Sequence, residues 1–563
     1  MATSISWERV LLNVDMEETL LDDSEIPRRY QEVENKSVPF APDGLSFWLV
    51  GDDGVFALKQ VQGELSGVVR VQINITNLAK RQPIPNGVWS IVPVLDGVAG
   101  LPATFNLQQA AVLPERSRAF LFDDNRQSYI VNFDLEEEDE RPELLIRAFQ
   151  FTRRAQKRNV NSVCKPQKRR AFSRHPLYDH ALQAWYRMWY ILTHHTGKRI
   201  LFAAQQRTRL EGNLLRVRDR MLERGLDSTF QLYEWHDVTN RGRIARSYSR
   251  LRLIRLMARC DIVLIDDYCG TLDHLTPDPK TVLAQLWHAG YGFKAVGFSR
   301  FGRYGSPTLG CGHGKYTYAI CGSQALKSVY AEVFGIEENA VLATGLPRID
   351  EFVDPFHEKS VEQQFEADYP QFADKRIVLF APTFRGRGKK DAYYDYSQID
   401  FHRLYDWCGE DTVFLFRMHP FIEQAPPIPE CFRNRLVDFS EYPSTNDLLY
   451  QANILITDYS SIVYEYSLLA RPIIFFAYDE MSYQATRGFH GAYRDIAPGK
   501  VCNSFDELMC ALEQQDYEIE KVVEYRDRYF QSIDGRATDR VIDSVILQIP
   551  RTDPVANPPG VGC

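Results

Sequence analysis

The feature that most constrains the fold of this chain is a regular alternation of apolar strands and helical segments that begins at residue 198. Strands that alternate with helices in this way form a parallel sheet through right-handed crossover connections. The alternation therefore predicts an α/β fold. The predicted strands of the first set are KRILFAAQ (198–205), STFQLYEW (228–235), DIVLIDD (261–267), KYTYAICG (315–322) and NAVLATG (339–345).

The same alternation starts again after a helical segment near 359–370. We therefore expect two Rossmann-like lobes, at 198–370 and at 371–550, with a closing helix in the second range. Ligands in such folds bind beyond the carboxyl ends of the strands, so functional residues are expected there. The second set of predicted strands is RIVLFAPT (376–383), TVFLFRMHP (412–420), NRLVDFS (434–440), NILITDYS (453–460) and RPIIFFAY (471–478).

Residues 1–150 have a different pattern. Short alternating segments rich in Val, Ile and aromatic residues are separated by Gly, Pro, Asn and Asp. This pattern is typical of antiparallel strands and predicts an N-terminal β-sandwich-like domain. The segment contains no cluster of catalytic residue types, so we interpret it as a binding or scaffolding module.

A basic linker and an amphipathic helix are expected over 151–197, with the positive charge concentrated in RRAQKRNVNSVCKPQKRR (153–170). One interpretation of the basic segment is a solvated interdomain linker. The other is contact with an anionic membrane or polymer, worth about 1 kcal/mol per charge near a lipid surface. The helix carries Trp185, Met188, Trp189 and Leu192 on one stripe, a pattern that favours core packing, although its position next to the basic segment keeps an interfacial role open.

Composition narrows the functional classes. Of 563 residues, 66 are Lys or Arg and 75 are Asp or Glu, and the net charge of −9 argues against a nucleic-acid binder. No apolar run is long enough for a transmembrane helix, and no secretory signal is seen. The ten cysteines form no Cys-x-x-Cys pair, and several lie in apolar segments, which predicts free thiols, a cytoplasmic location and no structural zinc.

Five motifs at the predicted strand ends, taken together and in this order, carry a resemblance. They resemble the CDP-glycerol glycerophosphotransferase family, the teichoic-acid polymerases and primases, over roughly residues 198–515. The motifs are AQLWHAGYGFKAVG (284–297), TGLPRID (344–350), LFAPTFRGRGKKDAYYDY (379–396), FRMHP (416–420) and ITDYSSIVYEYSLLARPIIFFAYDEM (456–481).

The resemblance implies a GT-B-like pair of lobes, with the acceptor at the first and the CDP-linked donor at the second. It implies transfer of glycerol phosphate from CDP-glycerol to a hydroxyl of a teichoic-acid-like or capsule polymer, with release of CMP and without a cofactor. It also implies a peripheral protein at the inner face of the cell membrane. CDP-ribitol enzymes share these motifs, so the donor alditol and the acceptor, a phosphate–polyol polymer or a lipid-linked molecule, stay open.

The motif ITDYSSIVYEY is predicted to bind the donor diphosphate. A strand ends at Thr457 and Asp458, and a helix begins at Ser460 and Ser461. The start of a helix offers free backbone N–H groups and the positive end of its dipole. Simple capping by Asp458 or Ser460 is the alternative. Glu465 stands where the family usually has Asp, and we expect it to bind the ribose or to hold a catalytic group.

Further phosphate ligands are expected in the second lobe. His419 and Arg417 in FRMHP are predicted to contact the phosphates, and His419 to protonate the leaving CMP. Thr383 and Arg385 in APTFRGRGKK are predicted phosphate ligands, because the planar guanidinium matches phosphate oxygens. A solvated basic loop is the alternative there. Arg487, in the segment RGFHG, is expected to face the cleft.

His288 in LWHAG is the predicted general base, because the attacking hydroxyl needs a proton acceptor near neutral pH. The family writes WHG followed by Thr and Pro, whereas this chain has Ala289, Gly290 and Tyr291. Lys294 keeps the family's basic position and is expected to offset phosphate charge. Gln205, Arg207 and Asn213 follow the first strand, on the acceptor side. Asp266 and Asp267 are too few ligands to predict a metal ion.

Two other functions remain open from the sequence. One is a GT-B glycosyltransferase that uses a nucleotide sugar. The other is a non-catalytic scaffold in polymer assembly, which the altered WHAG segment and the β-rich domain favour. The presence of His288, His419, Ser460 and Ser461 argues against a scaffold.

Overall fold

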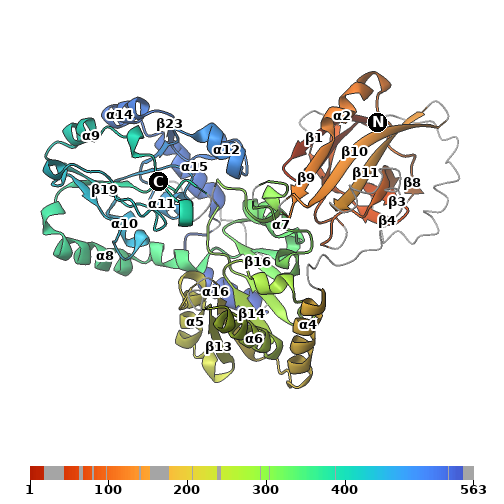
Figure 1. Ribbon diagram of the computed structural model, residues 1–563, viewed down its shortest axis with the longest axis horizontal. Helices are drawn as coiled ribbons and strands as arrows, with labels where there is room; N and C mark the ends of the chain where they lie inside the picture. Colours follow the sequence, from red (N-terminus) through yellow and green to blue (C-terminus); the bar gives the residue numbers. More distant parts are fainter. Residues whose placement is uncertain are drawn as a thin grey trace, which may run out of the picture.

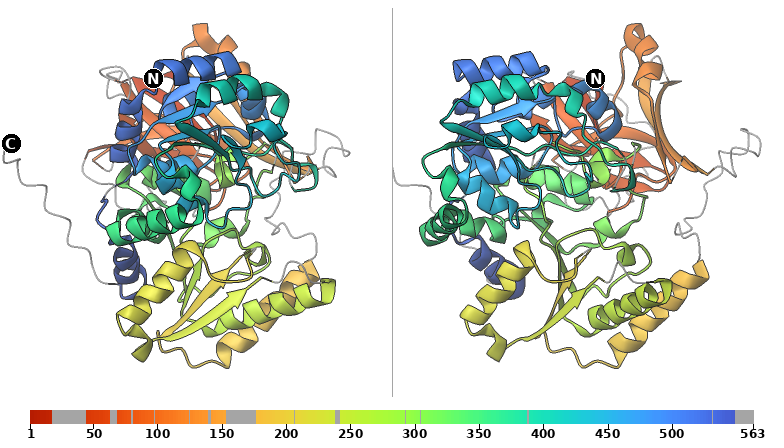
Figure 2. Two further views of the ribbon diagram at one scale, coloured as in Figure 1. Left: turned by 90° about the vertical axis from the view of Figure 1, so that its left-hand side faces the viewer. Right: turned by 60° about the vertical axis from the view of Figure 1, so that its left-hand side comes forward.

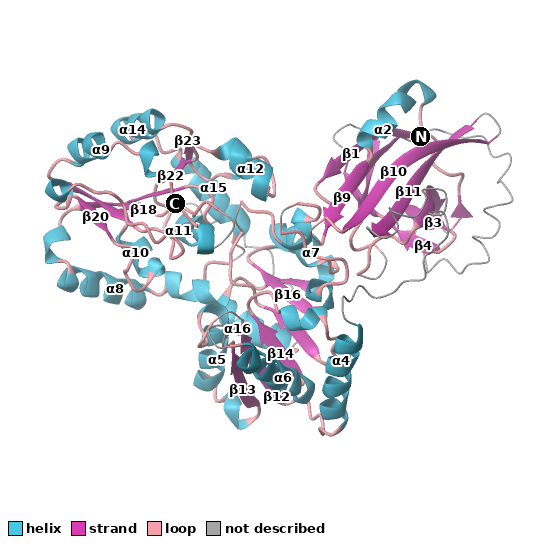
Figure 3. Ribbon diagram, viewed as in Figure 1, coloured by secondary structure: helices cyan, strands magenta, loops and turns pink. Residues whose placement is uncertain are grey.

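The computed structural model has three bodies, an N-terminal β domain and two α/β lobes (Figure 1). In each lobe a central sheet lies between helices, whereas the N-terminal domain consists mainly of strands (Figure 3). The structure describes residues 1–17, 44–62, 68–78, 81–96, 98–123, 125–138, 141–152, 176–205, 207–237, 242–291, 293–303, 305–386, 389–530 and 532–548.

The N-terminal domain contains two antiparallel sheets. One has the order β1 (Ala2–Glu8), β2 (Leu11–Glu17), β6 (Val68–Asn74), β5 (Lys59–Gln62). The other has the order β4 (Gly54–Ala57), β3 (Leu45–Gly51), β7 (Gly87–Leu95), β11 (Arg141–Thr152), β10 (Gln127–Glu138), β9 (Arg118–Phe122), with β8 (Val98–Ala99) beside β7. Apolar residues of both sheets share one core, so the predicted antiparallel domain is confirmed.

The first lobe is built on a six-stranded parallel sheet. Its strand order is β13 (Gln231–His236), β12 (Arg199–Ala204), β14 (Ile262–Ile265), β15 (Val282–Gln285), β16 (Tyr318–Cys321), β17 (Val341–Ala343). The main helices around it are α4 (Pro176–Ile191), α5 (Gly212–Glu223), α6 (Arg243–Arg259) and α7 (Lys327–Phe334). Strand β15, which ends at the polar Gln285, was not predicted.

The second lobe repeats the plan, with strand order β20 (Leu436–Asp438), β19 (Thr412–Phe416), β18 (Arg376–Phe380), β21 (Ile454–Thr457), β22 (Ile473–Phe476), β23 (Lys500–Cys502). Both sheets are parallel throughout, which confirms the predicted α/β fold. Its helices are α8 (Pro355–Asp368), α9 (Phe401–Cys408), α10 (Thr445–Gln451), α11 (Ile462–Ser467), α12 (Glu480–Arg487), α13 (Tyr493–Ile496), α14 (Phe505–Gln514) and α15 (Ile519–Tyr529).

The end of the chain returns to the first lobe. Helix α16 (Ala537–Val541) follows α15 of the second lobe in the sequence but lies beside α5 of the first lobe (Figure 1). The carboxylate of Asp350 accepts hydrogen bonds from the N–H groups of Ala537 and Thr538, at 2.9 and 2.8 Å. The chain therefore returns to the first lobe through α16, which lies within the range 371–550 where a closing helix is predicted.

The β domain is docked on the first lobe through a shared core. Phe298, Phe301 and Cys311 of the lobe pack into the apolar core of the β domain. Arg9 makes a two-pronged ion pair with the buried Glu332 of α7, with both N–O distances at 2.8 Å. The guanidinium of Arg9 also donates to the backbone carbonyl of His490 in the second lobe. One β-domain side chain thus contacts both lobes.

Helices α4 and α6 lie side by side at the foot of the first lobe (Figure 2). The predicted apolar stripe of α4 is divided between two environments. Trp185 and Trp189 pack against the core, whereas Met188 and Leu192 are 40% and 70% exposed. No helix in the described part of the chain is both long and apolar enough to span a bilayer. The basic segment 153–170 lies outside the described residues.

Candidate active site at the junction of the two lobes

The loop after β15 carries His288, and buried polar side chains fix its backbone. Gln285 accepts a hydrogen bond from the N–H of Trp287 at 2.9 Å. The amide of Asn213 on α5 donates to the carbonyls of Leu286 and Trp287, at 2.8 and 2.5 Å. These bonds hold Trp287 at a φ of 47°, a left-handed conformation that costs a non-glycine residue about 1–2 kcal/mol. The loop is therefore held in one strained conformation.

The hydrogen bonds of His288 define its tautomer. Its Nδ1 lies 3.1 Å from the carbonyl oxygen of Asp266, and because a carbonyl only accepts, Nδ1 carries the proton. The lone pair of the neutral ring is therefore on Nε2. Burial lowers the pKa of His288 below its ordinary value of 6.5, and the nearby Asp267 carboxylate partly offsets that effect. The imidazole is neutral at pH 7 and has the form that a general base requires.

Two cavities meet at His288. The first, which we call the aromatic cavity, has a volume of about 220 Å³ and lies between the lobes. The second, the polar cavity, has a volume of about 310 Å³. The aromatic cavity is lined by Trp287, His288, Ala289, Gly290, Tyr291, Phe293, Lys294, Val296, Val329, Tyr330, Val333, Tyr459, Ser461 and His490. The polar cavity is lined by Arg207, Glu211, Gly212, Asn213, Leu215, Arg216, Asp266, His288, Arg348, Glu351, Ser444 and Asn446.

Arg385 is the centre of a buried network in the second lobe. Its Nη1 lies 2.8 Å from Asp458 Oδ2, and its Nε and Nη2 lie 2.6 and 2.8 Å from the two carboxylate oxygens of Asp479. Four tyrosine rings surround the guanidinium at 5.3 to 5.6 Å. Arg385 is only 6% exposed, and in this geometry it holds together the ends of β18, β21 and β22. Its contact with a donor phosphate stays a prediction.

Three other predicted donor ligands belong to the same network. The Asp458 carboxylate accepts from the backbone N–H of Thr383 at 2.8 Å and from that of Tyr459 at 2.5 Å. The hydroxyl of Thr457 donates to the carbonyl of Ala381 at 2.7 Å. Thr383, Thr457 and Asp458 are all buried. Their side chains hold the ends of these strands in place, and direct phosphate contact by these three residues stays a prediction.

Ser460 and Ser461 begin α11, as the sequence predicts. The hydroxyl of Ser461 makes no capping hydrogen bond, and Ser461 lines the aromatic cavity. The hydroxyl of Ser460 accepts from the N–H of Ile462 at a long 3.4 Å. Because α11 has only six residues, its dipole is small. The hydroxyl of Ser461 is therefore a stronger feature of this site than the helix end.

His419 follows β19 and has the opposite tautomer to His288. Its Nδ1 accepts a hydrogen bond from the N–H of Phe421 at 3.2 Å, so Nε2 carries the proton. Burial, and then the positive charge of Lys294, lower the pKa of His419 to about 4. The neutral ring is therefore an N–H donor at pH 7. The guanidinium of Arg417 is engaged by the backbone, since it donates to the carbonyls of Phe439 and Ser440.

Lys294 and Arg487 come from different lobes. Lys294 lines the aromatic cavity, and its ammonium group lies 5.7 Å from the ring centre of Tyr483. Its backbone pairs with that of Phe489, which connects the first lobe to the segment after α12. Arg487 is the last residue of α12, and its side chain lies outside the described part of the structure. Its expected orientation toward the cleft stays a prediction.

A buried ion pair across the lobes involves Glu465. The carboxylate of Glu465 on α11 accepts from the guanidinium of Arg348, which lies in a 3-10 turn (Pro347–Val353) of the first lobe. The backbone N–H of Arg348 also donates to Asn213 at 2.9 Å. Burial raises the pKa of Glu465 above its ordinary value, and Arg348 partly opposes this. Glu465 therefore pairs with Arg348, a residue that the sequence did not indicate. Its predicted role, to bind the ribose or to hold a catalytic group, stays a prediction.

The altered WHAG segment has a packing explanation. A Cβ atom at Gly290 would overlap the ring of Tyr464, which projects from α11 into the first lobe. The Tyr464 ring stacks on Phe530 at 4.1 Å between centroids. Gly290 is therefore required where the two lobes interlock, and a threonine at this position would not fit.

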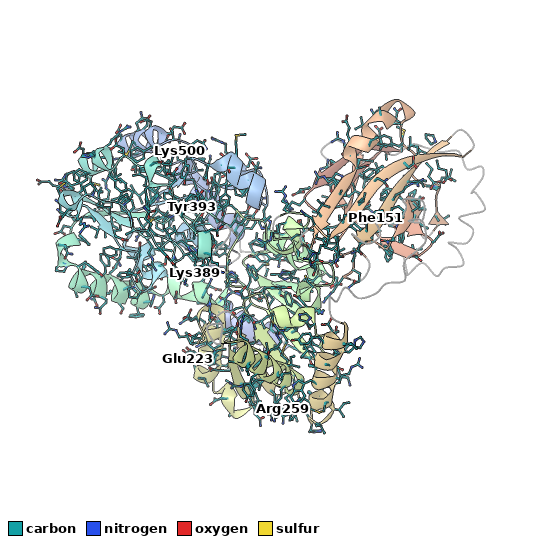
Figure 4. The ribbon with its side chains drawn as sticks, in the orientation of Figure 1. Phe151, Glu223, Arg259, Lys389, Tyr393 and Lys500 are labelled. Atoms are coloured by element: carbon teal, nitrogen blue, oxygen red, sulfur yellow. The ribbon has the colours of Figure 1, made fainter. Side chains whose placement is uncertain are left out.

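The loop after β18 folds back onto Arg385. Lys389 and Tyr393, labelled in Figure 4, belong to the loop after β18, and the backbone of Tyr393 pairs with that of Arg385. Within the described residues, no group of three or more His, Cys, Asp or Glu side chains has the arrangement of a metal site. Asp266 and Asp267 therefore have no third ligand among those residues.

Comparison with known proteins decides the family. Residues 184–547 match the family model described as CDP-glycerol:poly(glycerophosphate) glycerophosphotransferase. The chain belongs to this family. The family predicted from the five motifs is confirmed, and with it the prediction of an enzyme of the CDP-alditol phosphotransferase class. The β domain precedes the matched residues.

Individual relatives of the family vary in similarity. The teichoic acid ribitol-phosphate polymerase TarK of Staphylococcus aureus is 37% identical over 350 residues, which make up 62% of this chain and 68% of TarK. The teichoic acid poly(glycerol phosphate) polymerase of Staphylococcus epidermidis is 30% identical over 239 residues, 41% of this chain and 33% of that polymerase. A structure of the wall teichoic acid polymerase TagF aligns with a TM-score of 0.53 and 20% identity over 67% of this chain and 99% of that one, which supports a common fold.

Proposed function

We propose that this chain transfers an alditol phosphate from a CDP-alditol to a hydroxyl of a teichoic-acid-like polymer and releases CMP. Membership of the family supports this class of reaction. The higher identity to a ribitol-phosphate polymerase, 37% against 30%, favours CDP-ribitol over CDP-glycerol as the donor. We also propose a GT-B arrangement, in which the first lobe binds the acceptor, the second binds the donor, and no cofactor takes part.

The observation that carries the proposal is the neutral His288 with its lone pair on Nε2. In the reaction, the oxygen of the acceptor hydroxyl forms a bond to the phosphorus that bears the alditol. The bond from this phosphorus to the bridging oxygen breaks, and the electron pair leaves with CMP. Nε2 of His288 takes the hydroxyl proton, while the aromatic cavity that His288 shares with Ser461 and Lys294 holds the donor.

The negative charge on the two phosphates of the CDP-alditol has to be stabilised by hydrogen-bond donors and by cations. The Nε2–H of His419 is the free donor of that ring, and it suits the oxygen that leaves with CMP. The ammonium group of Lys294 lies close enough to lower the pKa of His419, so both groups act on the same region. A bound diphosphate would in turn raise the pKa of His419 and allow it to protonate the leaving group.

The test is to incubate the full chain with CDP-ribitol and with CDP-glycerol separately, each with a soluble poly(ribitol phosphate) or poly(glycerol phosphate) acceptor. We expect CMP and a new phosphodiester from one donor at least. Release of a nucleoside diphosphate from a nucleotide sugar, with a new glycosidic bond, would establish a glycosyltransferase instead. Absence of any turnover with all donors would favour a scaffold.

We further propose that the protein works in the cytoplasm, attached peripherally to the anionic inner face of the membrane. Helix α4, which follows segment 153–170 in the sequence, and helix α6, which packs against α4, support this. Ile191 of α4 is 80% exposed, and Ile244 and Tyr248 of α6 are 88% and 72% exposed. Such exposed apolar residues, flanked by arginines, suit the interface of an anionic bilayer. The arginines of α6 with described side chains, none of them paired with a described carboxylate, are Arg246, Arg250, Arg252, Arg255 and Arg259.

Sedimentation with vesicles tests the membrane proposal. We expect binding to phosphatidylglycerol vesicles that weakens as salt increases and after removal of 153–170, and little binding to phosphatidylcholine vesicles. Binding that is insensitive both to salt and to that deletion would contradict it.

A further inference from the structure

The polar cavity has a mixed chemical character that the donor does not explain. Three arginines, Arg207, Arg216 and Arg348, line it together with the carboxylates of Glu211, Glu351 and Asp266. A purely anionic ligand would favour arginine alone. Guanidinium groups beside carboxylates match a molecule that carries both a phosphate and several hydroxyls.

Asp266 is the least expected member of this lining. It is 1% exposed, yet its Oδ1 has no hydrogen-bond partner in the described structure. Its Oδ2 lies 3.7 Å from Arg207 Nη1, which is longer than a hydrogen bond. Burial of a carboxylate oxygen without a donor is costly, so the unpaired oxygen calls for a ligand that supplies one.

The main chain of Asp266 connects this cavity to the chemistry. Its carbonyl accepts the Nδ1 proton of His288, so the orientation of the base and the position of the Asp266 carboxylate depend on the same strand end. His288 itself lines both cavities. A hydroxyl held in the polar cavity thus lies next to the group that removes its proton.

We propose that the polar cavity binds the terminal alditol phosphate unit of the acceptor, with Asp266 accepting a hydrogen bond from an alditol hydroxyl and Arg207 and Arg216 binding the adjacent phosphate. The proposal rests on the proposed transferase function and names the acceptor subsite within it. Arg216 is exposed and has no ion-pair partner among the described residues, so its guanidinium is available. Arg207 contacts Glu211 at 3.6 Å, an exposed and weak pair.

Kinetics of three variants test the subsite. In Asp266→Asn, an amide N–H₂ takes the place of one carboxylate oxygen, which replaces an acceptor by a donor. In Arg216→Ala, the phosphate loses a cation. For both we expect the KM for the poly(alditol phosphate) acceptor to rise at least tenfold, with the KM for the CDP-alditol unchanged. Arg218→Ala is the matched control, because Arg218 lies on the same helix and pairs with Glu234 outside the cavity.

A second readout is independent of the polymer. Slow hydrolysis of the CDP-alditol by water releases CMP without an acceptor, and we expect Arg218→Ala, whose guanidinium pairs with Glu234 outside the cavity, to leave its rate unchanged. An unchanged acceptor KM in both Asp266→Asn and Arg216→Ala, or an equal rise in donor KM, would overturn the proposal. The thermal midpoint of each variant shows whether it folds. If Asp266→Asn does not fold, the acceptor KM of Arg216→Ala alone tests the proposal.

Direct binding separates this proposal from the proposed function. Ribitol 5-phosphate and glycerol 3-phosphate are titrated into the full chain by calorimetry, without donor. We expect wild type and Arg218→Ala to bind one of them, and Asp266→Asn and Arg216→Ala to bind it at least tenfold more weakly. If no donor is turned over but this pattern is found, the subsite stands and the transferase function fails. Equal affinities in all four proteins would refute the subsite even if transfer occurs.

Discussion

Replacement of Arg348 by methionine tests how strongly the two lobes are coupled. The change would leave the carboxylate of Glu465, whose side chain is 3% exposed, without its cation. Loss of one partner of a buried ion pair costs about 3–5 kcal/mol, because the remaining charge stays out of water. Replacement of both partners by apolar residues of similar size is close to neutral. We therefore expect Arg348→Met to be much less stable than Arg348→Met/Glu465→Leu.

The cost in stability of Arg348→Met depends on pH in a defined direction. The pKa of Glu465 is higher in the folded chain than its ordinary value of 4.5, so the folded state binds the extra proton. Stability then falls as the pH rises from 4.5 through the folded pKa. Without Arg348 the folded pKa rises further, and the fall extends to higher pH. The cost of Arg348→Met is thus small near pH 4.5 and largest above the folded pKa.

Urea unfolding at pH 5 and pH 8, followed by tryptophan fluorescence, measures both effects. The matched control is Arg403→Met, which removes an exposed ion pair with Asp506 and should leave the midpoint unchanged. Equal destabilisation by the single and double variants, at both pH values, would show that Arg348 and Glu465 are not energetically coupled.

Three further variants test the site and its supports. His288→Ala should abolish transfer and leave calorimetric binding of CDP-ribitol intact, and equal turnover of the mutant would exclude a general base. The wild-type rate should be constant above pH 7 and should fall at acidic pH, as the ring is protonated at a pKa that lies below its ordinary value of 6.5. Gly290→Thr should destabilise the chain by about 1–3 kcal/mol through overpacking, with recovery in Gly290→Thr/Tyr464→Ala, as measured by thermal midpoints; a midpoint equal to wild type would disprove the close contact. Arg9→Ala leaves the buried Glu332 unpaired at a cost of about 3 kcal/mol, so limited proteolysis should release the β domain faster, and an unchanged cleavage rate would argue against the docking.

The fold was predictable where strands are buried on both faces. β18, β19, β21 and β22 are nearly continuous apolar runs, and such runs are the signature of parallel strands between two layers of helices. The two strands of the lobes that sequence reasoning missed lack this signal. β15 (Val282–Gln285) ends in the polar Gln285, and β23 (Lys500–Cys502) is a three-residue strand at the sheet edge.

The motifs indicated which residues lie at the candidate site, but ion pairs between residues far apart in the sequence determine what the side chains of these residues contact. Arg385 was expected to bind phosphate, and the structure pairs it with Asp458, 73 residues away. Arg348 and Glu465 are 117 residues apart. Nothing local in a sequence tells which arginine will meet which carboxylate, because the pairing depends on how strand ends from different crossovers converge. The two histidines that the motifs predicted to be catalytic, His288 and His419, do follow strands, namely β15 and β19.

The change from the family's Thr and Pro to Gly290 and Tyr291 concerns the contact between the lobes. Gly290 admits the ring of Tyr464, and the carbonyl of Tyr291 accepts a hydrogen bond from the hydroxyl of Tyr525. The ring of Tyr291 packs on Tyr529, with 4.5 Å between centroids. None of these contacts involves the groups that orient His288, which are the Asp266 carbonyl and the amides that hold the loop before it. The altered motif therefore changes how the lobes interlock while the base keeps its position, and it gives no support to a scaffold without catalysis.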